Sequence, residues 1–177
     1  MADPVVVAVL GPTACGKSSL GLTLAERFGG EIINCDSTAV YRGFDIGTDK
    51  VPLAERRGVP HHLIDIAEPT EVYTAAQFAI DAARTIREIQ ARGRLPILVG
   101  GTGLYFKSAL LGISEIPQVP EAVRHEVRRR AAGKETKQLY EELTLLDPLS
   151  AEKLKPSDPQ RILRALEVFI ATGKPLI

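Results

Sequence analysis

Residues 11–18 read Gly11-Pro12-Thr13-Ala14-Cys15-Gly16-Lys17-Ser18, the complete G-x-x-x-x-G-K-S pattern of a phosphate-binding loop. An apolar run at residues 5–10 directly precedes the loop, and a helical pattern from about residue 17 to residue 28 follows it. A buried strand, a tight turn and a helix N-terminus in this order build a nest of backbone N–H donors. We therefore predict that residues 11–18 bind a diphosphate or a triphosphate.

Two side chains of this loop have separate roles in the pattern. Lys17 brings a positive charge that reaches the phosphates, and Ser18 offers its hydroxyl to a bound Mg²⁺. The loop thus predicts Mg²⁺ as a cofactor and Ser18 as its ligand from the protein.

Further apolar segments alternate between strand and helix patterns. We expect short strands at residues 31–35, 63–66 and 95–99, and a helix over residues 75–90. This alternation favours a parallel sheet with crossover helices. The predicted fold is α/β, a core like that of the P-loop NTPases with a parallel sheet flanked by helices, plus a small helical insertion.

The insertion is predicted from a change of character after Gly112. The chain becomes rich in proline and charge, with helical patterns near residues 121–132 and 136–146 and no strand between them. We therefore divide the chain into a P-loop core at residues 1–112, a helical insertion at 113–156 and a helix returning to the core at 157–177. Asp158 and Pro159 start that last helix. Its expected buried face comprises Ile162, Leu163, Leu166, Phe169 and Ile170.

Composition limits the cellular setting and the partners. Apolar residues make up 45% of the 177 residues, and the formal net charge is zero, so any nucleic-acid contact must come from a local patch. The sequence contains no run of eighteen apolar residues and no secretory signal pattern. Its two cysteines, Cys15 and Cys35, fit a reducing compartment. We expect a cytoplasmic monomer that does not bind membranes.

Asp36 and Thr102 each follow a predicted strand, where parallel sheets bind ligands. A carboxylate at Asp36 can act as a general base or hold a metal, and it can equally cap a local turn with Ser37. Thr102 follows two glycines at a helix N-terminus, where it can donate to a phosphate oxygen or simply cap the helix. Because the strand at 95–99 ends in glycines and not in a metal-binding aspartate, nucleotide hydrolysis loses support.

Two other polar clusters are weaker signals. His61 and His62 lack a third ligand at a suitable spacing, so a metal site there is improbable. Residues 121–137 contain six basic and three acidic side chains, and this local excess could follow an RNA backbone. The charges balance across residues 113–156, which weakens that signal.

Several segments in one order resemble the tRNA dimethylallyltransferase (tRNA isopentenyltransferase) family along nearly the whole chain. They are the phosphate loop, Asp36-Ser37-Thr38-Ala39-Val40-Tyr41-Arg42-Gly43, Asp45-Ile46-Gly47-Thr48, Pro60-His61-His62-Leu63-Ile64-Asp65, Leu98-Val99-Gly100-Gly101-Thr102-Gly103-Leu104-Tyr105 and Asp158-Pro159-Gln160-Arg161.

The resemblance implies prenyl transfer from dimethylallyl diphosphate to the exocyclic amine of the tRNA adenosine next to the anticodon. It implies that the phosphate loop holds the donor's diphosphate, with Lys17 in a catalytic role. Asp36 matches the family's general base, and Thr102 matches a residue that stabilises the reacting centre. The partners implied are tRNA and dimethylallyl diphosphate, and the implied tRNA contacts are Asp36, Ser37, Thr38, Ala39, Thr102, Arg124, Gln160, Arg161, Ile162, Leu163 and Arg164.

The chain departs from the family pattern in two ways. Many members have Gln at the position of Ala39, and the family runs well beyond 177 residues. We therefore expect a fragment whose isolated form lacks part of the catalytic apparatus. The alternatives are an adenylate isopentenyltransferase, which should lack the helical insertion, a P-loop kinase of a small molecule or nucleotide, and a nucleotide-binding module.

Overall fold

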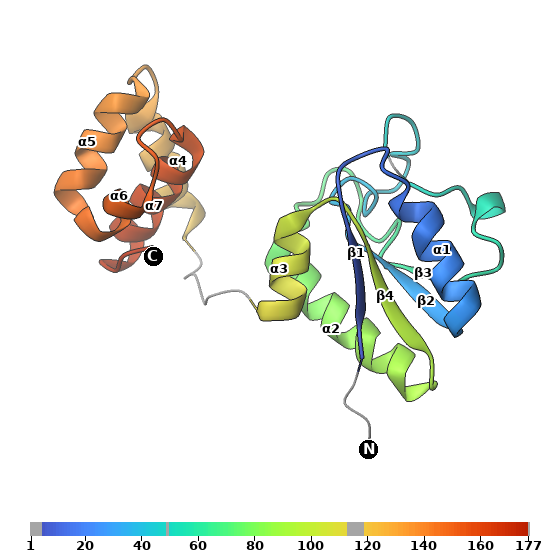
Figure 1. The fold of residues 1–177 in the computed structure, drawn as a ribbon. Coiled ribbons are helices and arrows are strands. Elements are labelled where there is room, and N and C mark those ends of the chain that lie inside the picture. Colours follow the sequence, from blue (N-terminus) through green and yellow to red (C-terminus); the bar gives the residue numbers. More distant parts are fainter. Residues whose placement is uncertain (1–4, 49, 113–118, 177) are drawn as a thin grey trace. The chain divides into compact units, whose positions relative to one another are not determined.

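The computed structural model describes residues 5–48, 50–112 and 119–176. Contacts divide the chain into two compact units, Met1–Ile113 and Ser114–Ile177 (Figure 1). The first unit contains the sheet and the second contains only helices among its described residues. Residues 113–118, with which the expected insertion begins, lie outside the described residues.

The described part of the first unit has one parallel four-stranded sheet in the order β1-β4-β2-β3. The strands are β1 (Val7–Leu10), β2 (Gly30–Asn34), β3 (His61–His62) and β4 (Leu95–Gly100). β4 pairs with both neighbours along its length, because Ile97 is in register with Val7 of β1 and Ile32 of β2. The central position of β4 brings the ends of β1, β2 and β4 to one edge.

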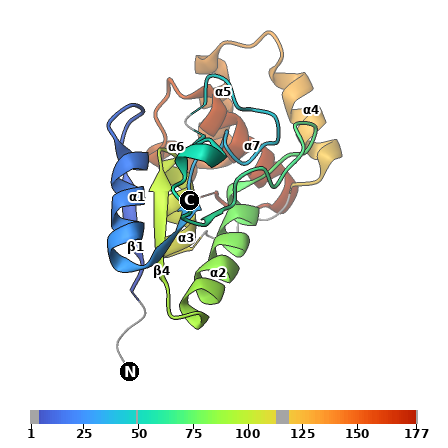
Figure 2. The ribbon, with the colours of Figure 1, turned by 90° about the vertical axis from the view of Figure 1, so that its right-hand side faces the viewer.

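Helices cover both faces of this sheet (Figure 2). α1 (Lys17–Phe28) packs on one face, and α2 (Ala75–Ala91) and α3 (Gly103–Leu111) lie on the other. Successive side chains of β4 point to opposite faces of the sheet, which explains the two cores. Ile97 packs with Leu22 of α1, whereas Leu98 packs with Phe78 of α2. The predicted α/β fold with a parallel sheet flanked by helices is confirmed.

The strand predictions were right in number but not everywhere in position. β1 begins two residues later than expected, and β2 begins and ends one residue earlier. The expected strand at 63–66 is wrong, because the pairing residues are His61 and His62. Leu63 and Asp65 have φ angles of 59° and 56°, which an extended strand does not allow. A short 3-10 helix (Leu53–Glu55) was also missed.

The second unit is a group of four helices within residues 119–176: α4 (Glu121–Ala131), α5 (Thr136–Leu146), α6 (Pro148–Lys153) and α7 (Pro159–Thr172). Leu143, Ile162 and Leu166 lie at the centre of its hydrophobic core. α6 was not predicted. Its start is nevertheless a local signal, since the Asp147 side chain accepts a hydrogen bond from Ser150 N.

α7 starts as predicted. Asp158 accepts from Arg161 N at the N-terminus, and Gly173 takes a left-handed conformation after the last turn. Ile162 and Leu166 are buried as expected, but Ile170 is exposed. The structure groups α7 with α4 and α5 in the second unit, so the expected boundary at residue 156 does not coincide with a boundary of packing.

Candidate functional site

The phosphate loop joins β1 to α1 and has the curled backbone that its sequence predicts. Ala14 and Gly16 have φ angles of 63° and 85°, which turn successive N–H groups toward one side. α1 has no acidic residue in its first turn, so the positive end of its dipole is not neutralised there. The Lys17 side chain is buried, and its Nζ donates to Pro12 O at 2.6 Å. This arrangement favours an anion.

Asp36 lies just beyond the end of β2 and does serve as a turn cap. Its Oδ1 accepts hydrogen bonds from Thr38 N at 2.9 Å and Thr38 Oγ1 at 2.6 Å. The cap is therefore made with Thr38 and not with Ser37. Asn34 holds the backbone of Asp36 through two hydrogen bonds of 3.2 Å. Among the described residues, none makes a hydrogen bond to Asp36 Oδ2, so one carboxylate oxygen is held and the other can accept a proton.

Thr102 sits directly before α3, as expected, but its hydroxyl does not cap that helix. It accepts a hydrogen bond from Ser37 N at 3.0 Å and donates to Ser37 Oγ at 3.3 Å. Thr102 N also donates to Cys35 O at 3.1 Å. These bonds tie the segment after β4 to the segment after β2, so that Thr102 and Asp36 belong to one rigid edge.

The close approach of these two segments depends on glycine. A Cβ atom on Gly100 would lie 2.3 Å from the carbonyl carbon and oxygen of Cys35, a distance that no side chain tolerates. A Cβ on Gly101 would lie 3.9 Å from Asp36 Oδ2 and 3.6 Å from Gly11 O. The glycines at the end of β4 thus place the Asp36 carboxylate beside the start of the phosphate loop.

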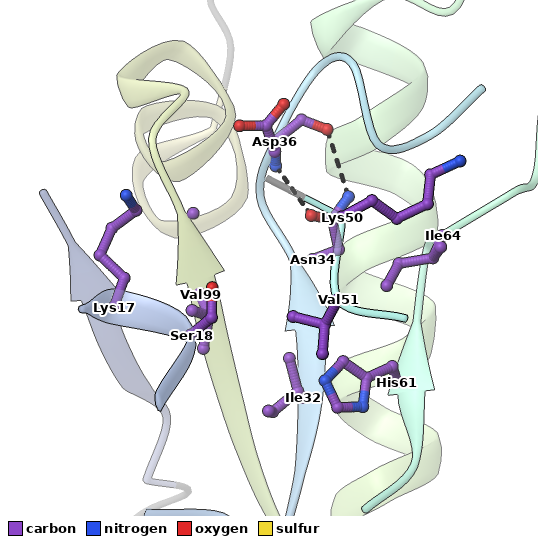
Figure 3. Close-up of a pocket in the computed structure, with 11 residues that line it drawn as sticks. Lys17, Ser18, Ile32, Asn34, Asp36, Lys50, Val51, His61, Ile64 and Val99 are labelled. Atoms are coloured by element: carbon purple, nitrogen blue, oxygen red, sulfur yellow. Dashed lines mark hydrogen bonds between the residues drawn. The ribbon is translucent and has the colours of Figure 1, made fainter. Parts of the chain in front are cut away.

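Two pockets open at this edge, and Asp36 lines both. The first has Lys17 and Ser18 on one side and Val51 and His61 on the other (Figure 3). Its complete lining is Lys17, Ser18, Ile32, Asn34, Asp36, Lys50, Val51, His61, Ile64, Val99 and Gly100. The second is lined by Thr13, Asp36, Ser37, Thr38, Gly47, Thr48, Gly101 and Thr102. The fold therefore brings together the phosphate loop, the Asp36 carboxylate and the Thr102 hydroxyl, which were predicted separately from the sequence.

Comparison with known proteins gives the family. A family model described as IPP transferase matches residues 39–177. The chain belongs to this family. It is 53% identical over 171 residues to the tRNA dimethylallyltransferase of Halorhodospira halophila (strain DSM 244 / SL1), covering 97% of this chain and 55% of the relative. It is 49% identical over 173 residues to that of Xanthomonas axonopodis pv. citri (strain 306), covering 98% and 53%.

Similar solved structures support the same family membership. The tRNA isopentenylpyrophosphate transferase of Bacillus halodurans is 43% identical, with a TM-score of 0.63 over 97% of this chain and 57% of that chain. A eukaryotic dimethylallyltransferase acting on tRNA is 34% identical, with a TM-score of 0.78 over 96% and 42%. The chain spans about half the length of the curated relatives it matches.

Of the tRNA contacts implied by this family, those in the first unit differ in exposure. Ser37 and Thr38 are exposed at the edge beside Asp36. Ala39 is buried, with 1% of its surface accessible, and its carbonyl oxygen accepts from Asp65 N at 3.2 Å. The side chain of Ala39 therefore faces the core and does not line a surface for RNA.

The tRNA contacts implied in the second unit are likewise partly exposed and partly buried. Arg161 is exposed and lies 3.6 Å from Asp158, and Gln160 is exposed beside it. Arg124 and Arg164 both approach Glu167, at 3.9 and 3.4 Å. Ile162 is fully buried in the helical core, and Leu163 is half-buried against it. The Ile162 side chain is thus a packing residue.

Sequence reasoning missed Lys50, whose side chain is only 5% exposed. Its Nζ donates to Asp65 at 2.7 Å, to Asp45 at 2.9 Å and to Tyr41 O at 2.9 Å. Burial alone would lower the pKa of Lys50, but the two carboxylates outweigh it and raise the pKa. Lys50 therefore stays charged and ties the loop after β2 to the segment after β3. Asp65 lies 15 residues from Lys50 in the sequence, so no short pattern marks this contact.

His61 was also missed as a pocket residue, having been considered only as a metal ligand. Its Nδ1 lies 2.8 Å from Val59 O, so Nδ1 carries the hydrogen. Burial lowers the pKa of His61, and the ring is therefore neutral near pH 7. Nε2 is then a buried acceptor without a hydrogen-bond partner among the described residues. No group of three or more metal-binding side chains occurs in the described parts of the chain.

Proposed function

We propose that this chain contains the part of a tRNA prenyltransferase that binds the prenyl donor and receives the acceptor adenosine. The reaction transfers the dimethylallyl group of dimethylallyl diphosphate to the exocyclic amine of the tRNA adenosine next to the anticodon. The observation that carries the proposal is the position of Asp36, which lines one pocket with Lys17 and Ser18 and another with Thr13 and Thr102. Family membership supplies the reaction class.

The phosphate loop would bind the diphosphate of the donor. An allylic diphosphate ionises readily, so the protein's main task is to stabilise the departing anion. Lys17, the N–H groups of the loop and the uncompensated start of α1 supply positive potential for it. The apolar side chains Ile32, Ile64 and Val99 line the same pocket and can exclude water from the allyl group.

Asp36 would accept the proton. In the reaction the C–O bond to the diphosphate breaks, the amine nitrogen forms a bond to that carbon, and the nitrogen loses one proton. Asp36 Oδ1 is held by Thr38, which leaves Oδ2 to take this proton. Thr102, tied to Ser37, stands at the same edge and can orient the reacting groups. The adenine must leave its stack to reach them.

Mg²⁺ fits this site as a diphosphate-bound ion held by few protein groups. Ser18 lines the pocket next to Lys17 and Asp36, and Mg²⁺ commonly keeps water and substrate phosphate oxygens as its other ligands. Ser18 would hold the ion, which when bound would neutralise charge on the diphosphate.

We further propose a cytoplasmic monomer whose helical unit contacts tRNA. Cys15 and Cys35 are both free thiols, which suits a reducing compartment. No helix within the described residues is long and apolar enough to cross a bilayer. Gel filtration with light scattering tests the monomer.

The test of function compares acceptors in parallel. A version of the protein extended to the length of its relatives, here called the extended protein, is incubated with labelled dimethylallyl diphosphate and tRNA, AMP or ATP. We expect label in tRNA alone, at the adenosine next to the anticodon. Label in AMP would instead identify an adenylate isopentenyltransferase. Phosphoryl transfer from ATP without prenyl transfer would identify a kinase.

A further inference from the structure

The helical unit contains a buried carboxylate surrounded by arginines. The side chain of Glu167, on α7, is only 5% exposed. Three guanidinium groups approach it: Arg128 Nε at 3.2 Å, Arg164 Nη1 at 3.4 Å and Arg124 Nε at 3.9 Å. Arg124 and Arg128 lie one turn apart on α4, and Arg164 lies one turn before Glu167. We call these four residues the arginine cluster.

The charges of the arginine cluster do not balance. Glu167 faces three guanidinium groups, and the only other carboxylate paired with them among the described residues is Glu121, 3.6 Å from Arg124, so the ion pairs leave an excess of one positive charge. A single ion pair would suffice to join α4 to α7, and each further arginine adds repulsion between like charges. The contact between the helices therefore involves one more guanidinium group than carboxylates. An anion bound from outside would relieve the repulsion.

The arginines of the cluster remain open to solvent. The side chains of Arg124, Arg128 and Arg164 are 36%, 67% and 33% exposed, although the carboxylate between them is buried. Arg124 Nε, which is buried, has no hydrogen-bond partner among the described residues. Glu167 thus holds the inner edges of the guanidinium groups, while parts of all three side chains reach the surface.

A second group on α4 shows a different arrangement. Glu126 pairs with Arg129 at 2.9 Å and with Arg130 at 2.7 Å, and all three side chains are exposed. These pairs form along the surface of one helix, where solvent and salt weaken them. Glu126 therefore offers a control that has the same charge and the same kind of partners, but no buried position between two helices.

Arg124 and Arg164 are already among the tRNA contacts that the family resemblance implies; we propose that Glu167 is the positioning residue that orients them and Arg128 toward the phosphate backbone of the RNA substrate. This rests on the proposed function in tRNA modification. Guanidinium groups match phosphate oxygens in geometry as well as charge, so their orientation matters for binding. By fixing three of them from below, Glu167 lowers the conformational entropy lost when RNA binds. The carboxylate, although negative, thus favours binding of a polyanion.

If Glu167 acts by positioning the arginines, its loss should weaken RNA binding. If only its charge matters, its loss should strengthen RNA binding, and the experiment distinguishes these two outcomes. Glu167→Gln and Glu126→Gln each remove one negative charge from the extended protein, and binding of a tRNA transcript is measured by fluorescence anisotropy. Positioning predicts that Glu167→Gln weakens binding by about tenfold, the scale of one lost charge-assisted contact. Glu126→Gln should leave affinity unchanged or slightly higher. Equal or tighter binding by Glu167→Gln would overturn the proposal.

Kinetics and a second variant guard against a misfolded protein. Glu167→Gln should raise KM for tRNA and leave kcat unchanged, which a loss of folded protein would not produce. Arg128→Ala, at an exposed position, should reduce the slope of log affinity against log salt by about 1. An unchanged slope would refute the phosphate contact. If the unaltered extended protein fails to bind tRNA, the proposed function itself is wrong.

Discussion

The two units hold their charged groups by different means. At the edge of the sheet, Asp36, Thr102 and Lys17 are held by hydrogen bonds that involve the backbone of neighbouring segments. In the helical unit, Glu167 is held by ion pairs between side chains of two helices. Hydrogen bonds to the backbone tie a side chain to a fixed segment, whereas ion pairs between partly exposed side chains allow adjustment and respond to salt.

This difference suits the two tasks that we propose. Proton transfer needs closely placed atoms, and the close packing of Gly100 against Cys35 limits how the two segments can shift. Binding of a long polyanion tolerates looser placement and benefits from several charges. Substitutions in the first unit should therefore affect catalysis or folding sharply, and those in the second should have graded effects that depend on salt.

The largest expected effect concerns Asp36. Asp36→Asn preserves shape but removes the proton acceptor, so single-turnover prenylation by the extended protein should slow by about 10²–10⁴-fold. Affinity for tRNA should change little. Glu26→Gln, which alters an exposed carboxylate paired with Arg57, is the control and should react normally. Intact chemistry with a large loss of affinity would make Asp36 an RNA-positioning group and would weaken the contrast between the units.

Lys17→Ala should have the next largest effect. Loss of a charge-assisted contact to the leaving diphosphate should cut turnover by about a hundredfold and weaken donor binding. The measurements are steady-state rates and calorimetric titration with dimethylallyl diphosphate. Lys107→Ala removes an exposed lysine of α3 and should change neither. Normal turnover of Lys17→Ala would show that the loop does not stabilise the leaving group.

Gly100→Ala tests the closed edge itself. A Cβ at 2.3 Å from the Cys35 carbonyl group must displace β2 or β4, and we expect a loss of about 1–3 kcal/mol in the free energy of unfolding. Gly103→Ala is the matched control, because a Cβ there meets nothing within 4 Å. Urea denaturation measures both variants. Equal stability of the two variants would mean that the backbone at this edge shifts at little cost in free energy.

The smallest expected effect concerns an ion pair inside the first unit. Glu31, on β2, lies 2.8 Å from Arg92 and 2.7 Å from His62. Burial would raise the pKa of Glu31, but the bonds from Arg92 and His62 outweigh it and lower the pKa below the ordinary value of 4.5. A lowered carboxyl pKa stabilises the fold above the unfolded pKa, and this contribution disappears as pH falls through the folded pKa.

Glu31→Gln should therefore cost about 1 kcal/mol at pH 7 and lose less stability than the unaltered protein on acidification below about pH 4.5. Urea denaturation at pH values from 3 to 7 measures the difference between the two proteins. Parallel pH profiles would show that the Glu31 pairs add nothing measurable to the stability.

Prediction from sequence succeeded where the signal was local. The phosphate loop, the bounds of α1 and α5, and the start of α7 at Asp158 and Pro159 follow from short patterns of glycine, caps and apolar spacing. It failed at β3, because strand position depends on pairing with β2 and on the left-handed conformation of Leu63. α6 was not predicted, although Asp147 and Pro148 start it in the same way as Asp158 and Pro159 start α7.

The candidate site likewise has one part that the sequence identified and another that only the tertiary structure revealed. Asp36, Thr102 and Lys17 stand next to recognisable turns, so the sequence alone identified them and, through the family resemblance, their implied roles. The tertiary structure decided that Thr102 binds Ser37, that Lys50 joins Asp45 to Asp65, and that Glu167 gathers three arginines. Helix starts and turns arise from interactions among neighbouring residues, which short sequence patterns record. Contacts between residues far apart in the chain arise only when packing brings those residues together.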